Sequence, residues 1–288
     1  MTSGFPEIVG VAGDLTGPSH NEQWRLLKIS AAVNGLIAGL LLAAAAMLIA
    51  GIFQLTPRYF VQTLIIFTGL IIALTPFLPQ HLPLTRFGPA NQVTLIRAAI
   101  AALIAGLVGG PLPEPVPAGG IAGLAGLALL LDGLDGRLAR RGGWQSRFGA
   151  RFDMETDAFL ILTLAALLWQ SGKTGGWVLL SGALRYGFVA AGLALPWLNQ
   201  PLPPHRRRQI VCVIQTAVLA WCLTPLVTVP WATGLAAGAL ALLILSFTLD
   251  VFWLARQSGV TKSLSSPRAS PEVPADHQCR FLRSTPKP

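Results

Sequence analysis

Residues 132–157 read DGLDGRLARRGGWQSRFGARFDMETD and hold five of the twelve acidic residues of this chain. Strongly apolar segments flank this acidic window on both sides. Carboxylates next to a bilayer are costly unless they pair, face water or bind a cation, so a cluster of them in this setting marks a functional site. The five acids are Asp132, Asp135, Asp153, Glu155 and Asp157.

The composition is that of a protein that uses lipid as its solvent. Hydrophobic residues make up 53% of the 288 residues, charged residues only 11%, and the mean hydropathy is +0.61. These values exclude an ordinary soluble domain. Apolar runs of about 17 to 25 residues can cross the membrane as helices, so we predict an all-α polytopic membrane protein. The predicted spans cover residues 29–53, 59–80, 93–110, 118–134, 154–172, 176–196, 209–228 and 231–254.

The basic residues predict the orientation of the chain. They concentrate in alternate loops, whereas the opposite loops carry little positive charge. By the positive-inside rule, both termini and the acidic window face the cytoplasm, and a bacterial inner membrane is the location we expect. The basic residues are Arg137, Arg140, Arg141, Arg147 and Arg151 after the fourth span, His205 and Arg206 to Arg208 after the sixth, and Arg256, Lys262 and Arg268 after the eighth.

The spacing of the acids predicts that they converge. Asp132 and Asp135 are three residues apart and Asp153 and Asp157 are four apart, so each pair shares one face of a helix. The connection between the pairs is short, and we expect the two helices to pack antiparallel and bring the four acids together. Carboxylates so placed repel one another, and a divalent cation relieves that repulsion. Ligation by oxygen alone favours magnesium or manganese, leaves calcium open, and disfavours zinc.

Small residues lie between and beside these acids. They allow either a bulky ligand to approach the backbone or two helices to pack closely. Arg140 follows Asp135 by about one turn and could neutralise a phosphate held by the metal. The small residues are Gly133, Gly136, Ala139 and Gly149.

The pattern D-x2-D-G-x2-A-R-x8-G-x3-D-x3-D resembles the signature of the CDP-alcohol phosphotransferase family, also called CDP-alcohol phosphatidyltransferases, at every fixed position. Asn91, Thr94 and Arg97 are similar to the N-x2-T-x2-R of the first family helix. The resemblance implies a six-helix catalytic core, here residues 85–256. An additional transmembrane hairpin at 29–84 precedes this core, and the sequence assigns it no role. Outside these we expect a polar cytoplasmic lead-in at 1–28, a proline-rich connection at 111–119 and a disordered tail at 257–288.

The resemblance also implies a reaction. Such enzymes transfer a phosphatidyl or other substituted phosphoryl group from a CDP-linked donor to an alcohol and release CMP, as in phospholipid biosynthesis. Two Mg²⁺ or Mn²⁺ ions would be held by Asp132, Asp135 and Asp153 with help from Asp157, which would also be the general base. The residues implied to line the CDP site are Gly136, Ala139, Arg140, Gly149, Asn91 and Thr94.

The chemistry of the residues agrees with that reaction. Attack of an alcohol on a pyrophosphate phosphorus needs charge neutralisation on the oxygens, which paired divalent ions supply. It also needs a base close to the hydroxyl. Neighbouring carboxylates would raise the pKa of such a base and bound metals would lower it, so the net direction stays open.

The acceptor is less constrained by the sequence. Arg185 lies in the middle of the sixth span and should face a water-filled cavity or a partner acid. With Arg206, Arg207 and Arg208 it could bind a phosphorylated acceptor such as glycerol 3-phosphate or inositol phosphate. The same arginines could instead bind lipid headgroups or set topology. Asp250 is expected to pair with a basic residue.

Other functions remain as alternatives. One is transfer of a CDP-linked headgroup to a lipid alcohol. Another is a cation-coupled transporter, although transporters place their charged sites near the bilayer midplane, whereas these acids cluster at one surface. The expected partners are the CDP-linked lipid, the alcohol acceptor and membrane lipids, with no nucleic acid, and a homodimer is one assembly that stays open.

Overall fold

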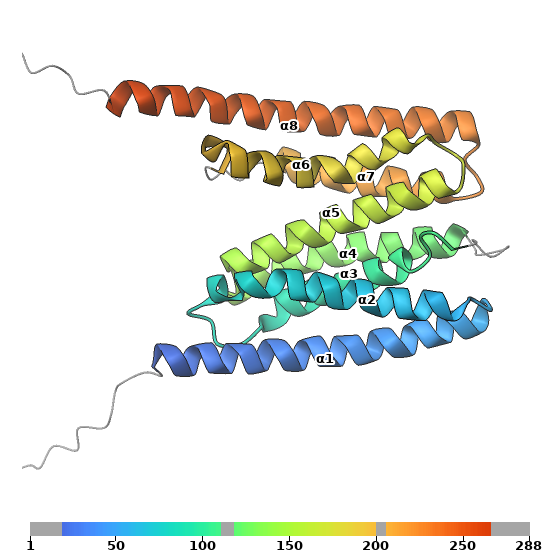
Figure 1. Ribbon diagram of the computed structural model, residues 1–288, viewed down its shortest axis with the longest axis horizontal. Helices are drawn as coiled ribbons and strands as arrows, with labels where there is room; N and C mark the ends of the chain where they lie inside the picture. The colour runs from blue at the N-terminus through green and yellow to red at the C-terminus, as the bar shows by residue number, and fades with distance from the viewer. Residues whose placement is uncertain (1–18, 111–117, 200–205, 266–288) are drawn as a thin grey trace, which may run out of the picture.

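The computed structural model describes residues 19–110, 118–199 and 206–265. Within these residues the chain is helical and contains no strand, which confirms the predicted all-α class. Successive α-helices run back and forth along one direction (Figure 1). The elements are α1 (His20–Ile52), α2 (Pro57–Leu74), η1 (Thr75–His81), α3 (Gly88–Ala105), α4 (Ala118–Gly142), α5 (Arg147–Gln170), η2 (Gly176–Leu179), α6 (Leu180–Ala194), η3 (Pro196–Asn199), α7 (Arg206–Leu223) and α8 (Val229–Ser265).

Each predicted span overlaps one of these α-helices, and the spans 59–80 and 176–196 also include residues of the 3₁₀ segments η1 and η2. Five of the described helical segments are long and apolar enough to cross a membrane, and the apolar part of α4, Gly119–Leu134, is shorter. Charged residues in the first turns of α5 and α7 reduce the apolar length of those two helices. The protein is therefore a polytopic integral membrane protein, and a count of eight crossings stays a prediction.

Some element boundaries differ from the sequence prediction. Helix α1 begins at His20, inside the predicted lead-in, because Ser19 and Glu22 form a reciprocal capping box: Glu22 N donates to Ser19 Oγ at 3.4 Å and Ser19 N donates to Glu22 Oε2 at 2.9 Å. Helix α8 continues past residue 256 to Ser265. The predicted tail beyond it and residues 111–117 of the predicted linker lie outside the described residues.

Helix α3 occupies the centre of the bundle. It packs against α4 and α5 and also against the α1–α2 hairpin, while α7 packs against α4, α5 and α8. In Figure 1 the hairpin and α8 lie at opposite sides of the molecule, with α3, α4 and α5 between them. Alanines at positions 98, 101, 102 and 105 of α3 are buried and let its neighbours approach closely. Polar side chains on this enclosed helix must therefore find partners inside the protein.

Candidate metal centre

Three carboxylates surround one buried guanidinium. Arg97, in the middle of α3, has only 2% of its side chain exposed. Its Nη2 lies 3.1 Å from Asp132 Oδ1 on α4 and also donates to Asp157 Oδ1 on α5, while its Nη1 donates to Asp153 Oδ1. The central helix thus holds the two acid-bearing helices together through ion pairs.

The arrangement corrects one detail of the sequence prediction. The acids of α4 and α5 do converge, but both helices make their main contacts with α3 and α7. Direct antiparallel packing of α4 on α5 is therefore not what brings the acids together. Arg97 bridges them, because a guanidinium with several donors can bind carboxylates that approach from different sides.

The three carboxylates fit the donor set of a divalent cation. One oxygen from each of Asp132, Asp153 and Asp157 lies within 4.8 Å of the others. Exposure of the side chain is 11% for Asp132, 24% for Asp157 and 37% for Asp153, so the cluster opens toward solvent at one side. With all three ionised, the carboxylates outweigh the single positive charge of Arg97 by two. An all-oxygen site with this excess charge could hold a hard divalent ion.

Asp135, the second acid of the pair on α4, is described only in its backbone. The backbone of Asp135, Gly136, Ala139 and Arg140 belongs to α4, and their side chains lie outside the described residues. The three-residue spacing from Asp132 is the sequence-based reason to expect Asp135 at the same site. A ligand role for Asp135 stays a prediction.

Asn91 and Gly149, predicted for the same site, lie against each other. A Cβ added to Gly149 would come within 2.7 Å of Asn91 Oδ1. Asn91 Nδ2 donates to Phe87 O at 2.6 Å, which leaves Oδ1 directed at α5. Thr94, one turn deeper on α3, donates its hydroxyl to Ala90 O at 3.1 Å. The glycine thus allows α3 and α5 to approach closely at the end of the bundle where α5 begins.

The predicted acceptor arginines are engaged with acids. Arg185 Nη2 on α6 contacts Glu155 Oε1 on α5 at 2.8 Å, so its expected partner acid is found. On α7, Arg207 Nη2 lies 2.5 Å from Asp250 Oδ1 and Arg208 Nε lies 3.4 Å from Asp250 Oδ2. The prediction that Asp250 pairs with a basic residue is confirmed. The side chain of Arg206 lies outside the described residues.

Sequence reasoning missed two contacts of the acid cluster. It assigned Arg97 to a motif without seeing that this arginine binds the acids, although a lone charge in an apolar helix is itself a signal that a carboxylate lies nearby. It also did not identify Cys212, whose Sγ on α7 lies 3.6 Å from Asp157 Oδ2. Nothing in the sequence marks that contact, because the spacing of Cys212 forms no motif.

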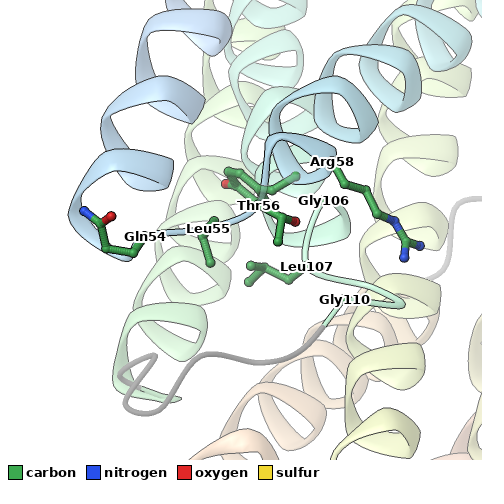
Figure 2. Close-up of a pocket in the computed structure, with 8 residues that line it drawn as sticks. Gln54, Leu55, Thr56, Arg58, Gly106, Leu107 and Gly110 are labelled. Atoms are coloured by element: carbon green, nitrogen blue, oxygen red, sulfur yellow. The ribbon is translucent and has the colours of Figure 1, made fainter.

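A cavity elsewhere in the bundle does not compete with this site. The cavity in Figure 2 lies where α1, α2 and α3 meet, at the end opposite to the start of α5. Its volume is about 90 Å³, below the roughly 300 Å³ of a typical ligand site. Among its lining residues, Arg58 already donates to Gly109 O at 2.8 Å. The cavity is too small for a nucleotide, and none of its described lining residues is an acid.

The helical membrane bundle and its carboxylate cluster are compatible with a membrane enzyme that binds a divalent ion. Residues 89–249, more than half of the chain, match the family model described as CDP-alcohol phosphatidyltransferase, and the chain belongs to that family. Searches of curated proteins and of solved structures give no significant match. Membership implies phosphatidyl transfer from a CDP-alcohol by a metal-dependent transferase in the membrane. Helices α1 and α2 and the η1 segment lie outside the matched residues.

Removing Arg97 should make the protein depend on divalent ions for stability. In excess chelator, Arg97→Met should lose about 3 to 5 kcal/mol of stability, because the buried carboxylates are left without their cation. Added Mg²⁺ or Mn²⁺ should recover more of the thermal midpoint in this variant than in the wild type, since the ion then supplies the missing positive charge. Thermal unfolding in detergent, with and without chelator, measures both effects.

Arg185→Met is the matched control for this experiment. It also removes an intramembrane arginine, but the partner is the single acid Glu155. Its midpoint should fall without any change in the response to divalent ions. Equal metal-induced shifts in Arg97→Met, Arg185→Met and the wild type would contradict the role assigned to Arg97.

Proposed function

We propose that this protein transfers a phosphatidyl group from a CDP-linked lipid, such as CDP-diacylglycerol, to an alcohol and releases CMP in phospholipid biosynthesis. The observation that carries the proposal is the cluster of Asp132, Asp153 and Asp157 around Arg97. All four residues lie inside the segment that matches the family model. The acids lie in the part of the bundle toward the end of α4 and the start of α5, which suits an enzyme that takes a lipid from the membrane and a polar acceptor from water.

The proposed metal ligands are the three clustered acids together with Asp135. We infer two ions, Mg²⁺ or Mn²⁺, which when bound would neutralise charge on the pyrophosphate oxygens of the donor. Arg97 contacts one oxygen of each described acid, so we infer that the second oxygens would turn toward a ligand. Pre-positioning by Arg97 reduces the rearrangement that the acids need when the donor binds.

Asp157 is the proposed general base. Its Oδ1 binds Arg97, whereas its Oδ2 has the weak Cys212 contact at 3.6 Å. A proton from the acceptor hydroxyl would pass to Oδ2 as the new phosphoester bond forms and the bond to CMP breaks. Asp157 lies deeper in the bundle than Asp153 on the same face of α5, which separates the reacting hydroxyl from bulk water.

The donor nucleotide would bind where α3 and α5 approach closely. Asn91 and Gly149 come together there, and Thr94 follows Asn91 by one turn of α3. The CDP moiety would lie over these residues and over the final turns of α4. The residues of α4 proposed for this contact are Gly136, Ala139 and Arg140. We place this end of the bundle at the cytoplasmic face of a bacterial inner membrane, because the basic residues gather there.

The proposed acceptor carries a phosphate. Arg207 and Arg208 both contact Asp250, and with Arg206 they place three basic residues in succession at the start of α7. Arg206 begins the same helix, and the amino end of a helix also favours anions. Glycerol 3-phosphate and inositol phosphate are the candidates of this kind. Arg185 contributes less, since Glu155 neutralises it.

Release of CMP from CDP-diacylglycerol by the purified protein tests the reaction. Turnover should require Mg²⁺ or Mn²⁺ and a phosphorylated alcohol, and Asp153→Asn should lower kcat/KM by roughly two orders of magnitude, because ligand charge is lost with little change in volume. Glu155→Gln is the matched control: it alters an acid in the same window that pairs away from the cluster, and it should keep most of the turnover.

The outcomes separate the parts of the proposal. Full turnover in excess chelator, or wild-type rates for Asp153→Asn, would overturn the metal site. Turnover with serine or a lipid alcohol but with neither glycerol 3-phosphate nor inositol phosphate would overturn the acceptor assignment and leave the reaction class intact. Absence of CMP release from every CDP-linked donor would overturn the reaction itself.

A variant of Asp157 distinguishes a base from a metal ligand. If this residue mainly removes the acceptor proton, Asp157→Asn should lower kcat far more than it weakens the Kd of the CDP-linked lipid, since the lost interaction acts in the transition state. Single-turnover kinetics and equilibrium binding of the donor give the two quantities. A comparable loss in donor affinity would show that Asp157 acts first as a ligand.

A further inference from the structure

A chain of hydrogen bonds links the N-terminal hairpin to the first turn of α5. His81, the last residue of η1, is 1% exposed. Its Nε2 lies 2.9 Å from Arg86 O and its Nδ1 lies 2.7 Å from Ser146 Oγ. Ser146 Oγ in turn accepts from Gly149 N at 2.9 Å. The chain therefore starts outside the segment that matches the family model and ends on a signature glycine.

The chemistry of the partners fixes the direction of each bond. A carbonyl oxygen only accepts, so Nε2 of His81 carries the proton that is donated to Arg86 O. In a neutral imidazole the other nitrogen then accepts, and Ser146 donates its hydroxyl proton to Nδ1. The Ser146 oxygen remains free to accept from the Gly149 backbone. Each donor in this chain therefore has an acceptor, and hydrogen bonds linked in this way strengthen one another in surroundings of low dielectric constant.

This chain ends at the point where α5 is positioned against α3. Ser146 is the N-cap of α5, so its hydroxyl determines where the helix begins. Gly149 in the first turn faces Asn91 Oδ1 with no room for a Cβ. The His81 ring also packs edge-on against Phe148, with ring centroids 5.9 Å apart. A shift of His81 would therefore move the first turn of α5 relative to Asn91.

Two other polar contacts attach the hairpin to the core. Ser30 Oγ accepts from Phe87 N at 3.0 Å, and Asn34 Oδ1 accepts from Gln92 Nε2 at 2.8 Å. Both partners belong to α3 or to the residue before it. The Asn34 contact holds the hairpin on α3 without touching the start of α5, whereas Phe87 also packs against Phe148, with ring centroids 6.1 Å apart. The His81 contact is thus separable by mutation from general attachment of the hairpin.

We propose that His81 is a positioning residue for the donor-binding end of the active site, acting through Ser146 on the first turn of α5. This inference rests on the proposed function, because the substrate it affects is the CDP-linked lipid. It gives the additional hairpin a role: the hairpin supplies a side chain that sets the spacing between Gly149 and Asn91. His81 itself touches no reacting atom.

Three variants test the proposal in steady-state CMP release. His81→Phe keeps an aromatic ring beside Phe148 but removes both hydrogen bonds, and it should raise the donor KM about fivefold to tenfold while kcat and acceptor KM change little. His81→Gln offers one acceptor and one donor and should restore most of the donor KM. Asn34→Ala breaks the contact with Gln92 and is the matched control, with the donor KM of the wild type.

A double variant tests the route through Ser146. Ser146→Ala should itself raise the donor KM, and adding His81→Phe to it should cause no further rise, because the two residues act in series. Additive effects would overturn the route. Equal changes in His81→Phe and Asn34→Ala, or a loss confined to thermal stability with an unchanged donor KM, would overturn the positioning role.

Hydrogen exchange tests the same link without substrate. Amides of residues 146–150 should exchange faster in His81→Phe than in the wild type, while Asn34→Ala leaves that segment unchanged and His81→Gln restores its protection. Unchanged exchange in His81→Phe would overturn the link even in an active enzyme. If wild-type protein releases no CMP from any CDP-linked donor, the proposed function fails, and the exchange result still decides whether His81 orders α5.

Discussion

The buried ion-pair cluster of Arg97 is the constraint on which the arrangement of the core depends. A guanidinium enclosed by helices in an apolar bundle is costly unless partners such as carboxylates neutralise it. Asp132 comes from α4, and Asp153 and Asp157 come from α5, so both helices must lie against α3 at a fixed height. The same requirement gathers the acids that the reaction uses. Stability and chemistry therefore share one set of side chains.

Part of this site could be predicted from the sequence and part could not. Helical spacing alone places Asp153 and Asp157 on one face, and the eight fixed signature positions predict a family that the matched residues confirm. Periodicity says which face of a helix is polar, but it does not say which helix packs there. For that reason the bridging role of Arg97 and the position of α3 between the acid-bearing helices emerged only in three dimensions.

The contacts around the site differ in how far local sequence determines them. The capping box at Ser19 and Glu22 is a local pattern, readable without tertiary structure. The sequence predicted that Asp250 pairs with a basic residue, because a buried acid needs a cation. It did not predict that the partners are Arg207 and Arg208. The contact between His81 and Ser146 joins residues far apart in the chain, and no sequence pattern predicts it.

Binding of Mn²⁺ to the purified protein, followed by electron paramagnetic resonance, tests the central claim that the acids around Arg97 form a metal site. The wild type should bind Mn²⁺, and Asp132→Asn, Asp153→Asn and Asp157→Asn should each weaken binding by about tenfold or more, since each change removes a charged ligand. Asp250→Asn, which alters an acid paired with Arg207, should leave Mn²⁺ affinity unchanged. Equal Mn²⁺ affinity in the wild type and in all three cluster variants would contradict the account.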